Sequence, residues 1–242
     1  MDPLTATAAS GLRARMESLE LLANNIANAS TDGYKADREF YSLYVAPEAE
    51  GAEPLATMPV IERPWIDLSQ GTIHTTGNPL DAALTGAGFF AVDGPSGPLY
   101  TRNGSFQLSK DGRLVTSEGY AVRSVGGQPI VLESLRSVDI AIDGTVRQAG
   151  NPVGQIEIVD FPVGAGLSKQ GSNYLRAADP AKRAAASAAV EQGKLEASNA
   201  GSAEAAVRLV SVMRQFEMMQ KAVTLGNEMN RAAVEQVARV GS

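Results

Sequence analysis

The sequence SAEAAVRLVSVMRQFEMMQKAVTLGNEMNRAAVEQVARV, from Ser202 to Val240, decides the fold of this chain. Two rows of residues recur there at every seventh position, which is the pattern of a helix that packs along one seam. The rows are Leu209, Phe216, Val223, Asn230 and Val237, and Val212, Met219, Gly226, Ala233 and Val240. No proline interrupts them, and a helix of about 38 residues would be roughly 57 Å long. Such a helix is too long for a small core of its own.

Two residues weaken this seam. Gly226 lowers helix stability by about 1 kcal/mol, and Asn230 places an amide where an aliphatic side chain would pack better. Two interpretations stay open. The helix packs on its own domain, or it becomes fully buried only in an assembly of several chains.

The start of the chain predicts a second amphipathic helix over residues 3–30. Asp2 is a suitable N-cap, and Pro3 suits the first helical position. Its rows are Thr5, Leu12, Leu19 and Ile26, and Ala8, Arg15, Leu22 and Ala29. The helix is expected to stop near residues 30–33, where Gly33 can take the left-handed conformation. The simplest arrangement pairs this helix with the C-terminal one.

Three asparagines fall near the end of that first helix, where their helix propensity is poor. Asn24 and Asn28 share a face, and Asn25 points about 100° away. The amides either satisfy the free carbonyls of a fraying turn or bond to neighbouring chains. The residues alone favour neither interpretation.

Composition excludes several classes of function. The chain has 242 residues, a net charge of −6 and no cysteine, so we expect no nucleic-acid partner, no disulfide and no thiolate chemistry. No apolar run is long enough to span a membrane. The first residues lack the pattern of a secretory signal. We expect a cytosolic protein, or one that leaves the cell by a route without a cleaved signal.

The middle of the chain changes character twice. Four prolines between residues 36 and 68 predict an extended connector. From Gln70, closely spaced glycines and Asp-Gly or Gly-Gly turns between apolar runs predict an all-β domain. The predicted fold class is α+β, with the terminal helices pairing as a coiled-coil-like layer. The predicted parts are 1–34 (N-terminal helix), 35–69 (connector), 70–190 (β domain) and 191–242 (C-terminal helix).

No catalytic, cofactor or metal site is recognisable in the sequence. His74 lies in a polar strand context without a serine motif, and residues 86–88 lead into a strand rather than opening a helix, so they are no dinucleotide loop. Asp81 lies in an apolar run and needs a partner. Arg102 is one candidate, and a turn-capping role for Asp81 is the other.

Short motifs along the chain, except in the connector and in residues 176–190, resemble those of the axial proteins of the bacterial flagellum. Residues 23–28 and 30–35 resemble "ANNxAN…TxGYK", and residues 76–84 resemble "TGNPLDLAI". Residues 86–92 resemble "GxGFFxV", and residues 100–106 resemble "YTRNGSF". Residues 195–199 resemble the "LExSN" that starts the C-terminal helix of the family, and residues 213–221 resemble its "QRxYExxxK", with Phe216 in place of the tyrosine.

This resemblance implies a structural subunit of the flagellar basal-body rod, not an enzyme. Its implied partners are further copies of itself, other rod and hook proteins and the flagellar type III export apparatus, without membrane insertion. The rod transmits torque across the periplasm and encloses the export channel. Chain length favours a proximal-rod position over a distal one.

The residues expected at the assembly interface come from both terminal helices. They are Leu12, Leu19, Leu22, Asn24, Asn25, Ile26, Asn28, Leu209, Val212, Phe216, Met219, Val223, Asn230 and Val237. The alternative is a soluble β module that binds glycan or peptidoglycan and oligomerises through coiled-coil ends.

Overall fold

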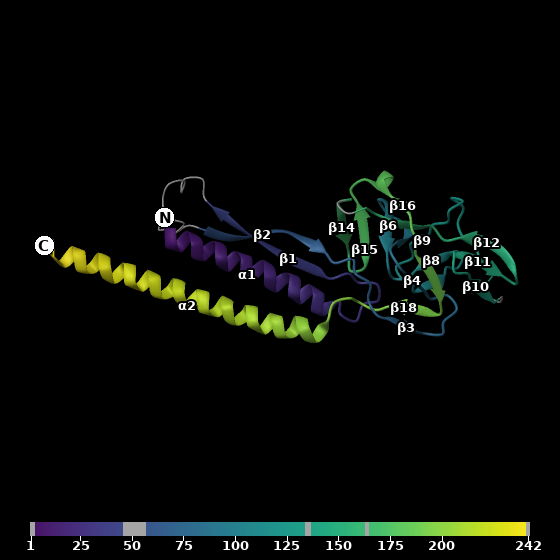
Figure 1. The fold of residues 1–242 in the computed structure, drawn as a ribbon. Helices are drawn as coiled ribbons and strands as arrows, with labels where there is room; N and C mark the ends of the chain where they lie inside the picture. Colours follow the sequence, from purple (N-terminus) through teal and green to yellow (C-terminus); the bar gives the residue numbers. More distant parts are fainter. Residues whose placement is uncertain (1–2, 46–56, 134–136, 163–164, 241–242) are drawn as a thin grey trace. The chain divides into compact units, whose positions relative to one another are not determined.

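The structure is a computed structural model of the chain, and it describes residues 3–45, 57–133, 137–162 and 165–240. The chain forms two compact units, and the polypeptide passes from one to the other four times. Unit 1 holds residues 1–27, 37–65 and 201–242, and unit 2 holds residues 28–36 and 66–200. The architecture is α+β, with a helix near each end of the chain and a central β-rich part (Figure 1).

Unit 1 is built from the two long helices and two paired strands. The helices are α1 (Pro3–Ala27) and α2 (Ser202–Val240), and the strands are β1 (Asp37–Val45) and β2 (Thr57–Ile66), of which Ile66 belongs to unit 2. The helix predicted from the C-terminal heptads is present. The N-terminal helix ends at Ala27, earlier than predicted, because residues 28–33 form turns. Residues predicted as a connector contain the strand pair.

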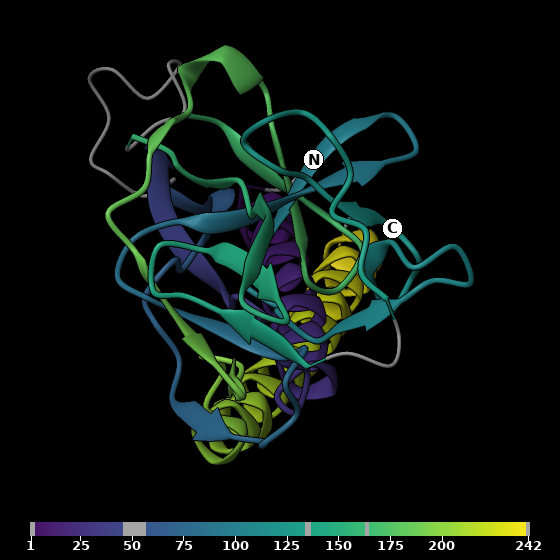
Figure 2. The same ribbon diagram turned by 90° about the vertical axis from the view of Figure 1, so that its right-hand side faces the viewer.

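The two helices run antiparallel and side by side (Figures 1 and 2). They approach closely at Gly11, where an added Cβ would lie 3.4 Å from the Cε of Met219. On α2 the face formed by the two predicted heptad rows is the covered one. Val212 is buried, and Leu209, Phe216, Met219 and Val223 are half-buried. On α1 the most buried row is Gly11, Ala14, Ser18, Leu22 and Asn25, whereas Leu12, Leu19 and Ile26 are half-buried.

The register of this pair leaves part of α2 uncovered by α1. Because Gly11 lies against Met219 and the helices are antiparallel, Pro3 falls near residue 227. The last 13 or so residues of α2, roughly 20 Å of helix, extend beyond the first described residue of α1.

Unit 2 holds the remaining strands. They are β3 (Ile73–Thr75), β4 (Ala82–Thr85), β5 (Phe89–Gly94), β6 (Gly97–Thr101), β7 (Phe106–Leu108), β8 (Leu114–Thr116), β9 (Ala121–Val122), β10 (Val138–Ile140), β11 (Thr145–Gln148), β12 (Asn151–Gln155), β13 (Ile158–Asp160), β14 (Leu167–Gln170), β15 (Tyr174–Ala177), β16 (Ala184–Ala185), β17 (Ala189–Gln192) and β18 (Lys194–Glu196). The alanine-rich segment before β16 forms only the short 3₁₀ helix η2 (Pro180–Lys182), capped by Asp179.

The largest sheet has nine strands and follows the order β14-β15-β6-β5-β9-β8-β7, with β13 also paired to β5 and β16 paired to β13. Its hairpins follow the glycine-rich turns that the sequence indicates. The core packs on both sides of β5, where Phe90 meets Phe106 edge-on with ring centroids 5.2 Å apart. Two further strand pairs, β4 with β17 and β3 with β18, place residues 189–196 beside residues 73–85.

Two glycines allow a direct test of these helix and turn assignments. Gly226 lies inside α2, and an added Cβ would meet nothing within 4 Å. Gly226→Ala should therefore stabilise unit 1 by about 1 kcal/mol, because alanine has the higher helix propensity. Urea unfolding followed by far-UV circular dichroism measures the change.

Gly33→Ala is the matched control. Gly33 has a φ of 72°, and an added Cβ would lie 2.2 Å from the backbone nitrogen of Asn103. This substitution should destabilise the protein. Equal effects of the two substitutions would contradict the described conformations.

Candidate functional site

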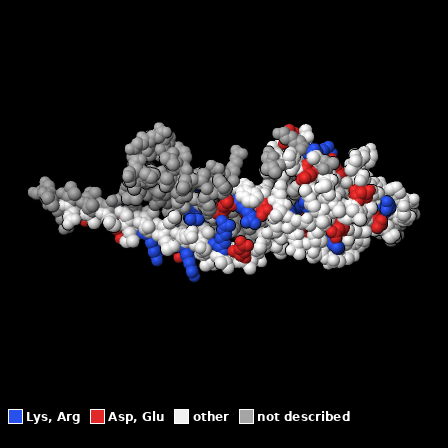
Figure 3. All heavy atoms as spheres, viewed as in Figure 1, with Lys and Arg blue, Asp and Glu red and all other residues white. Residues whose placement is uncertain are grey.

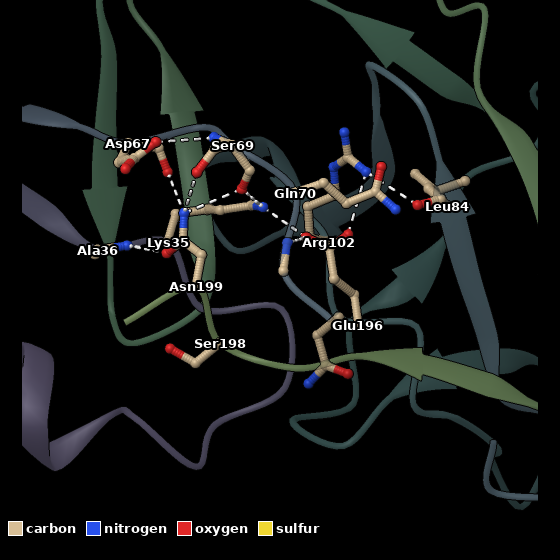
Figure 4. A network of polar contacts seen from close by, with 12 residues as sticks. Lys35, Ala36, Asp67, Ser69, Gln70, Leu84, Arg102, Glu196, Ser198 and Asn199 are labelled. Atoms are coloured by element: carbon tan, nitrogen blue, oxygen red, sulfur yellow. Dashed lines mark hydrogen bonds and ion pairs between the residues drawn. The ribbon is translucent and has the colours of Figure 1, made fainter. Parts of the chain in front are cut away.

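The centre of the candidate site is Glu196, a carboxylate at the end of β18 that is only 1% exposed. Strand β18 pairs with β3, with Glu196 opposite Ile73. A buried carboxylate needs partners for both oxygens. Two cationic side chains and one backbone N–H supply them, all within unit 2 (Figure 4).

Lys35 and Gly71 bind one oxygen of Glu196. The Nζ of Lys35 lies 2.6 Å from Oε1, and the backbone N–H of Gly71 donates to the same oxygen at 2.9 Å. Lys35 also donates to the carbonyl of Ser69 at 2.6 Å. One lysine therefore joins the N-terminal segment to two other parts of unit 2.

Arg102 binds the other oxygen. Its Nη1 lies 3.2 Å from Oε2 of Glu196 and 3.2 Å from the carbonyl oxygen of Leu84, and its Nη2 donates to the carbonyl of Gly86 at 2.6 Å. The guanidinium carbon lies 5.3 Å from the ring centroid of Phe89. Arg102 follows β6, so the large sheet itself carries this cation.

Asn199 makes a second set of bonds three residues after Glu196. Its Oδ1 accepts from the backbone N–H of Ala36 at 2.7 Å. Its Nδ2 donates to the carbonyls of Asp67 and Ser69, at 2.8 and 3.0 Å. One amide thus fixes three chain segments at the residues where they leave unit 2.

Gly33 brings the N-terminal segment close to this network. Its N–H donates to the carbonyl of Glu196 at 2.7 Å, and its backbone lies against Arg102 and Asn103 so closely that a Cβ does not fit. The positive φ and the lack of a side chain are both needed there. This explains why a glycine directly precedes the Tyr34-Lys35 pair.

The electrostatics of the site follow from two buried cations that share one buried carboxylate. Burial lowers the pKa of Lys35 below its ordinary value, and attraction by Glu196 together with their hydrogen bond opposes this shift. Burial likewise lowers the pKa of Arg102, again opposed by Glu196. Both cations are only 3% exposed. The arrangement holds chain segments together and leaves no carboxylate oxygen of Glu196 open to a substrate.

Three family descriptions match consecutive parts of the chain. Residues 6–35 match "Flagella basal body rod protein", residues 83–148 match "Flagellar hook protein FlgE/F/G D1 domain", and residues 191–236 match "Flagellar basal body rod FlgEFG protein C-terminal". Each of the three matched ranges supplies one member of the network, namely Lys35, Arg102 and Glu196.

Curated relatives match nearly the whole chain. "Flagellar basal-body rod protein FlgF" of Caulobacter vibrioides is 31% identical over 92% of this chain and 92% of its own length. "Flagellar basal-body rod protein FlgG" is 33% identical in Agrobacterium fabrum, over 93% of this chain and 95% of the relative. The protein of that name from Bacillus subtilis is also 33% identical, over 90% and 93%.

The chain belongs to the flagellar basal-body rod proteins. It is a structural rod subunit and not an enzyme, as the resemblance of its motifs predicts. Similarity to hook and rod families also implies assembly with other flagellar components. Within the described ranges, no helix is both long and apolar enough to cross a membrane.

Of the two roles that the sequence leaves open for Asp81, turn capping is correct, and the predicted start of the C-terminal helix is wrong. Asp81 does not pair with Arg102 but accepts from the hydroxyl of Thr76 at 2.6 Å and the amide of Asn78 at 2.9 Å, which is the turn-capping role. The "LExSN" segment does not start the C-terminal helix, because Glu196 ends a strand and α2 begins at Ser202.

The three asparagines of the N-terminal motif occupy different environments. Asn25 is buried and exchanges two hydrogen bonds with the backbone of Asp37, at 2.8 and 2.9 Å. Asn28 lies in the turn directly after the helix, and its carbonyl accepts from the N–H of Thr31 at 3.1 Å. Asn24 is exposed. Asn25 and Asn28 thus make bonds inside their own chain. The sequence alone left these bonds and bonds to neighbouring chains equally open.

The other predicted interface residues also differ in how far they are buried. Leu22 and Val212 are buried, and Leu12, Leu19, Ile26, Leu209, Phe216, Met219 and Val223 are half-buried within the single chain. The side chains of Asn230 and Val237 lie outside the described residues. The sequence analysis did not predict Glu196 as the centre of the site. Lys35, Arg102 and Glu196 each lie in one of the family motifs, but nothing in the sequence connects the three motifs with one another.

Removing the charge of Glu196 tests the network. Glu196→Gln leaves Lys35 and Arg102 buried without their counter-charge, so we expect the free energy of unfolding of unit 2 to fall by about 3–5 kcal/mol. Chemical denaturation followed by near-UV circular dichroism measures it.

Glu191→Gln is the matched control. Its carboxylate forms a partly exposed ion pair with Lys194 at 2.6 Å, and such pairs contribute about 1 kcal/mol or less. If both variants lose the same stability, the buried network does not hold unit 2 together.

Proposed function

We propose that the chain polymerises helically through its two terminal helices, in a rod that transmits torque and encloses the export channel. The observation that carries this proposal is the exposure of α2. It is 39 residues long, yet its described buried and half-buried side chains lie mainly on the one face that the two heptad rows form. A long helix with most of one face unused gains burial when further chains pack beside it.

The neighbours in this proposal are copies of the chain and other rod and hook proteins. The interface lies on unit 1, with the predicted seam residues bringing α1 and α2 together so that the outer faces can meet neighbours. We also propose, from the family alone, that the chain reaches the rod through the flagellar export apparatus without a cleaved signal. Relatives named FlgF and FlgG share nearly the same sequence identity with this chain, 31% and 33%. Identity therefore does not distinguish between rod positions, and the proximal position stays a prediction.

A deletion strain tests the structural role. Cells without the chain should assemble no hook or filament and should not swim, since each axial part is built on the preceding one. A copy with a peptide tag in the exposed turn at Gly126-Gly127 should restore motility and remain in purified basal bodies. Motile deletion cells, or a tagged chain that is absent from basal bodies, would overturn the proposal.

Amide hydrogen exchange tests whether assembly completes the burial of unit 1. In dilute protein, amides of α2 should exchange faster than those of β5, because α2 is covered along one face and β5 lies in the core. In assembled rods, α2 should become protected while β5 changes little. Full protection of α2 in a small closed oligomer would instead favour the binding-module alternative.

A further inference from the structure

We propose that a small cavity in unit 2 binds one carboxylate group attached to an apolar body, with Arg176 as the residue that holds the carboxylate. The cavity has a volume of about 240 Å³ and lies on one face of the large sheet, where the β5–β6, β8–β9 and β14–β15 turns meet. All residues that line it belong to unit 2. The inference goes beyond the proposed function and does not depend on polymerisation, because the dilute chain is enough to test it.

Strand β15 supplies the floor of the cavity. Tyr174 and Arg176 alternate with Leu175 along the strand, so they point to the same face of the sheet. Leu175 pairs with Tyr100 of β6, which places Arg176 beside Leu99. Leu99 and Tyr174 belong to the main core, and both line the cavity. The half-buried arginine is therefore held at the edge of an apolar core.

Arg176 has hydrogen-bond donors that the chain does not use. Its Nη1 donates to the carbonyl of Ser96 at 3.2 Å. Its Nε is buried and has no hydrogen-bond partner among the residues that the structure describes. A buried N–H without an acceptor is costly. An acceptor from outside the chain that reaches this nitrogen is therefore bound favourably.

The charge of Arg176 is also uncompensated. On the face of unit 2 that Figure 3 shows, Lys and Arg side chains mostly lie beside Asp or Glu. Arg123, for example, contacts Asp93 at 3.0 Å and Glu157 at 2.8 Å. Within the described ranges, no ion pair involves Arg176. Its charge is therefore available to an anionic ligand.

The geometry of the free donors favours a carboxylate. The Nε and Nη2 atoms of an arginine lie on one planar edge, and their two N–H groups match the two oxygens of a carboxylate. A phosphate fits the same edge but carries a second charge, which the carboxylate of Glu118 in the same cavity repels. The cavity therefore favours a monoanion.

Glu118 is fixed in the cavity as a charged group. Its carboxylate accepts hydrogen bonds from the hydroxyls of Tyr174 and Ser117. Burial raises the pKa of Glu118, but these hydrogen bonds outweigh it and bring the pKa below its ordinary value. Glu118 therefore stays ionised at neutral pH and balances Arg176 when the cavity is empty of ligand.

The walls of the cavity suit an apolar group. The half-buried ring of Tyr120 meets Tyr174 edge-on, with ring centroids 5.4 Å apart, and Pro95 and Leu99 also line the cavity. The volume is below the range of about 300–1,000 Å³ for pockets that hold drug-sized ligands. The ligand is therefore a single small aromatic or aliphatic group with one carboxylate. It comes either from a free small molecule or from a carboxylate of a neighbouring protein.

Nuclear magnetic resonance of the dilute full-length protein tests the site, with phenylacetate as the probe. The Nε–H signal of Arg176, identified by its loss in Arg176→Lys, should shift saturably with a dissociation constant on the order of 1 mM, as expected for one ion pair and a few apolar contacts. Phenylacetamide is the matched neutral compound. It should bind roughly tenfold more weakly, because it lacks the charge that pairs with Arg176.

Substitutions separate charge from geometry, with binding followed on the ring signals of phenylacetate. Arg176→Gln should weaken binding by roughly tenfold or more, because the charged hydrogen bonds are lost. Arg176→Lys keeps the charge without the planar edge, so its effect should be intermediate. Arg113→Gln is the matched control, because Arg113 is exposed and lies outside this cavity. It should leave the affinity unchanged, and backbone spectra show whether each variant is folded.

Three results would overturn the inference. They are equal binding of phenylacetate and phenylacetamide, binding that survives Arg176→Gln in a folded variant, and the absence of a saturable shift of the Arg176 signal.

Incorporation into rods identifies the source of the carboxylate. If a neighbouring protein supplies it, Arg176→Gln should lower the amount of the chain in basal bodies more than Arg113→Gln does. If a small molecule supplies it, both variants should be incorporated equally. Absence of the unaltered chain from basal bodies contradicts the proposed function and leaves the resonance measurement unaffected.

Discussion

The structure depends on one buried carboxylate between two buried cations. Glu196 comes from the end of the β-rich segment, Lys35 from the segment after the first helix, and Arg102 from the central sheet. None of these side chains could stay buried and charged without the others. Unit 2 is therefore complete only when parts of the chain about 160 residues apart in sequence have come together. An isolated segment such as 70–175 lacks both Lys35 and Glu196.

The position of this network explains why it is polar. The chain leaves and re-enters unit 2 at residues 27/28, 36/37, 65/66 and 200/201. Lys35 and Asn199 lie near two of these passages, and both side chains donate to the backbone carbonyl of Ser69, which lies near a third. Asn199 also accepts from the backbone N–H of Ala36. Apolar packing at such a place would tolerate several registers, whereas bonds between named donors and carbonyls select one. We regard specificity rather than added stability as the reason for the buried charges.

Periodicity predicted those parts of the fold in which local sequence alone decides the structure. The heptads of α2 and the glycine turns of the β hairpins depend on residues a few positions apart, and both were found as predicted. The paired strands at 37–66 were read as a connector, because prolines dominate the local signal while pairing depends on a distant partner. The true partner of Arg102 lies 94 residues away, so no spacing rule connects it with Glu196.

The interface residues illustrate a different limit of sequence reading. A heptad search finds the strongest apolar stripe on a helix, and on α2 this stripe is used inside the chain. The exposed residues Val207, Met218, Leu225 and Met229 of α2 form a second apolar stripe with spacings of 11, 7 and 4. Charged residues interrupt it, so the same search does not detect it. Once the structure shows which face is covered, the remaining apolar face becomes informative. A subunit that buried both faces of α2 by itself would have no reason to polymerise, and one that buried neither would not hold α2 in place.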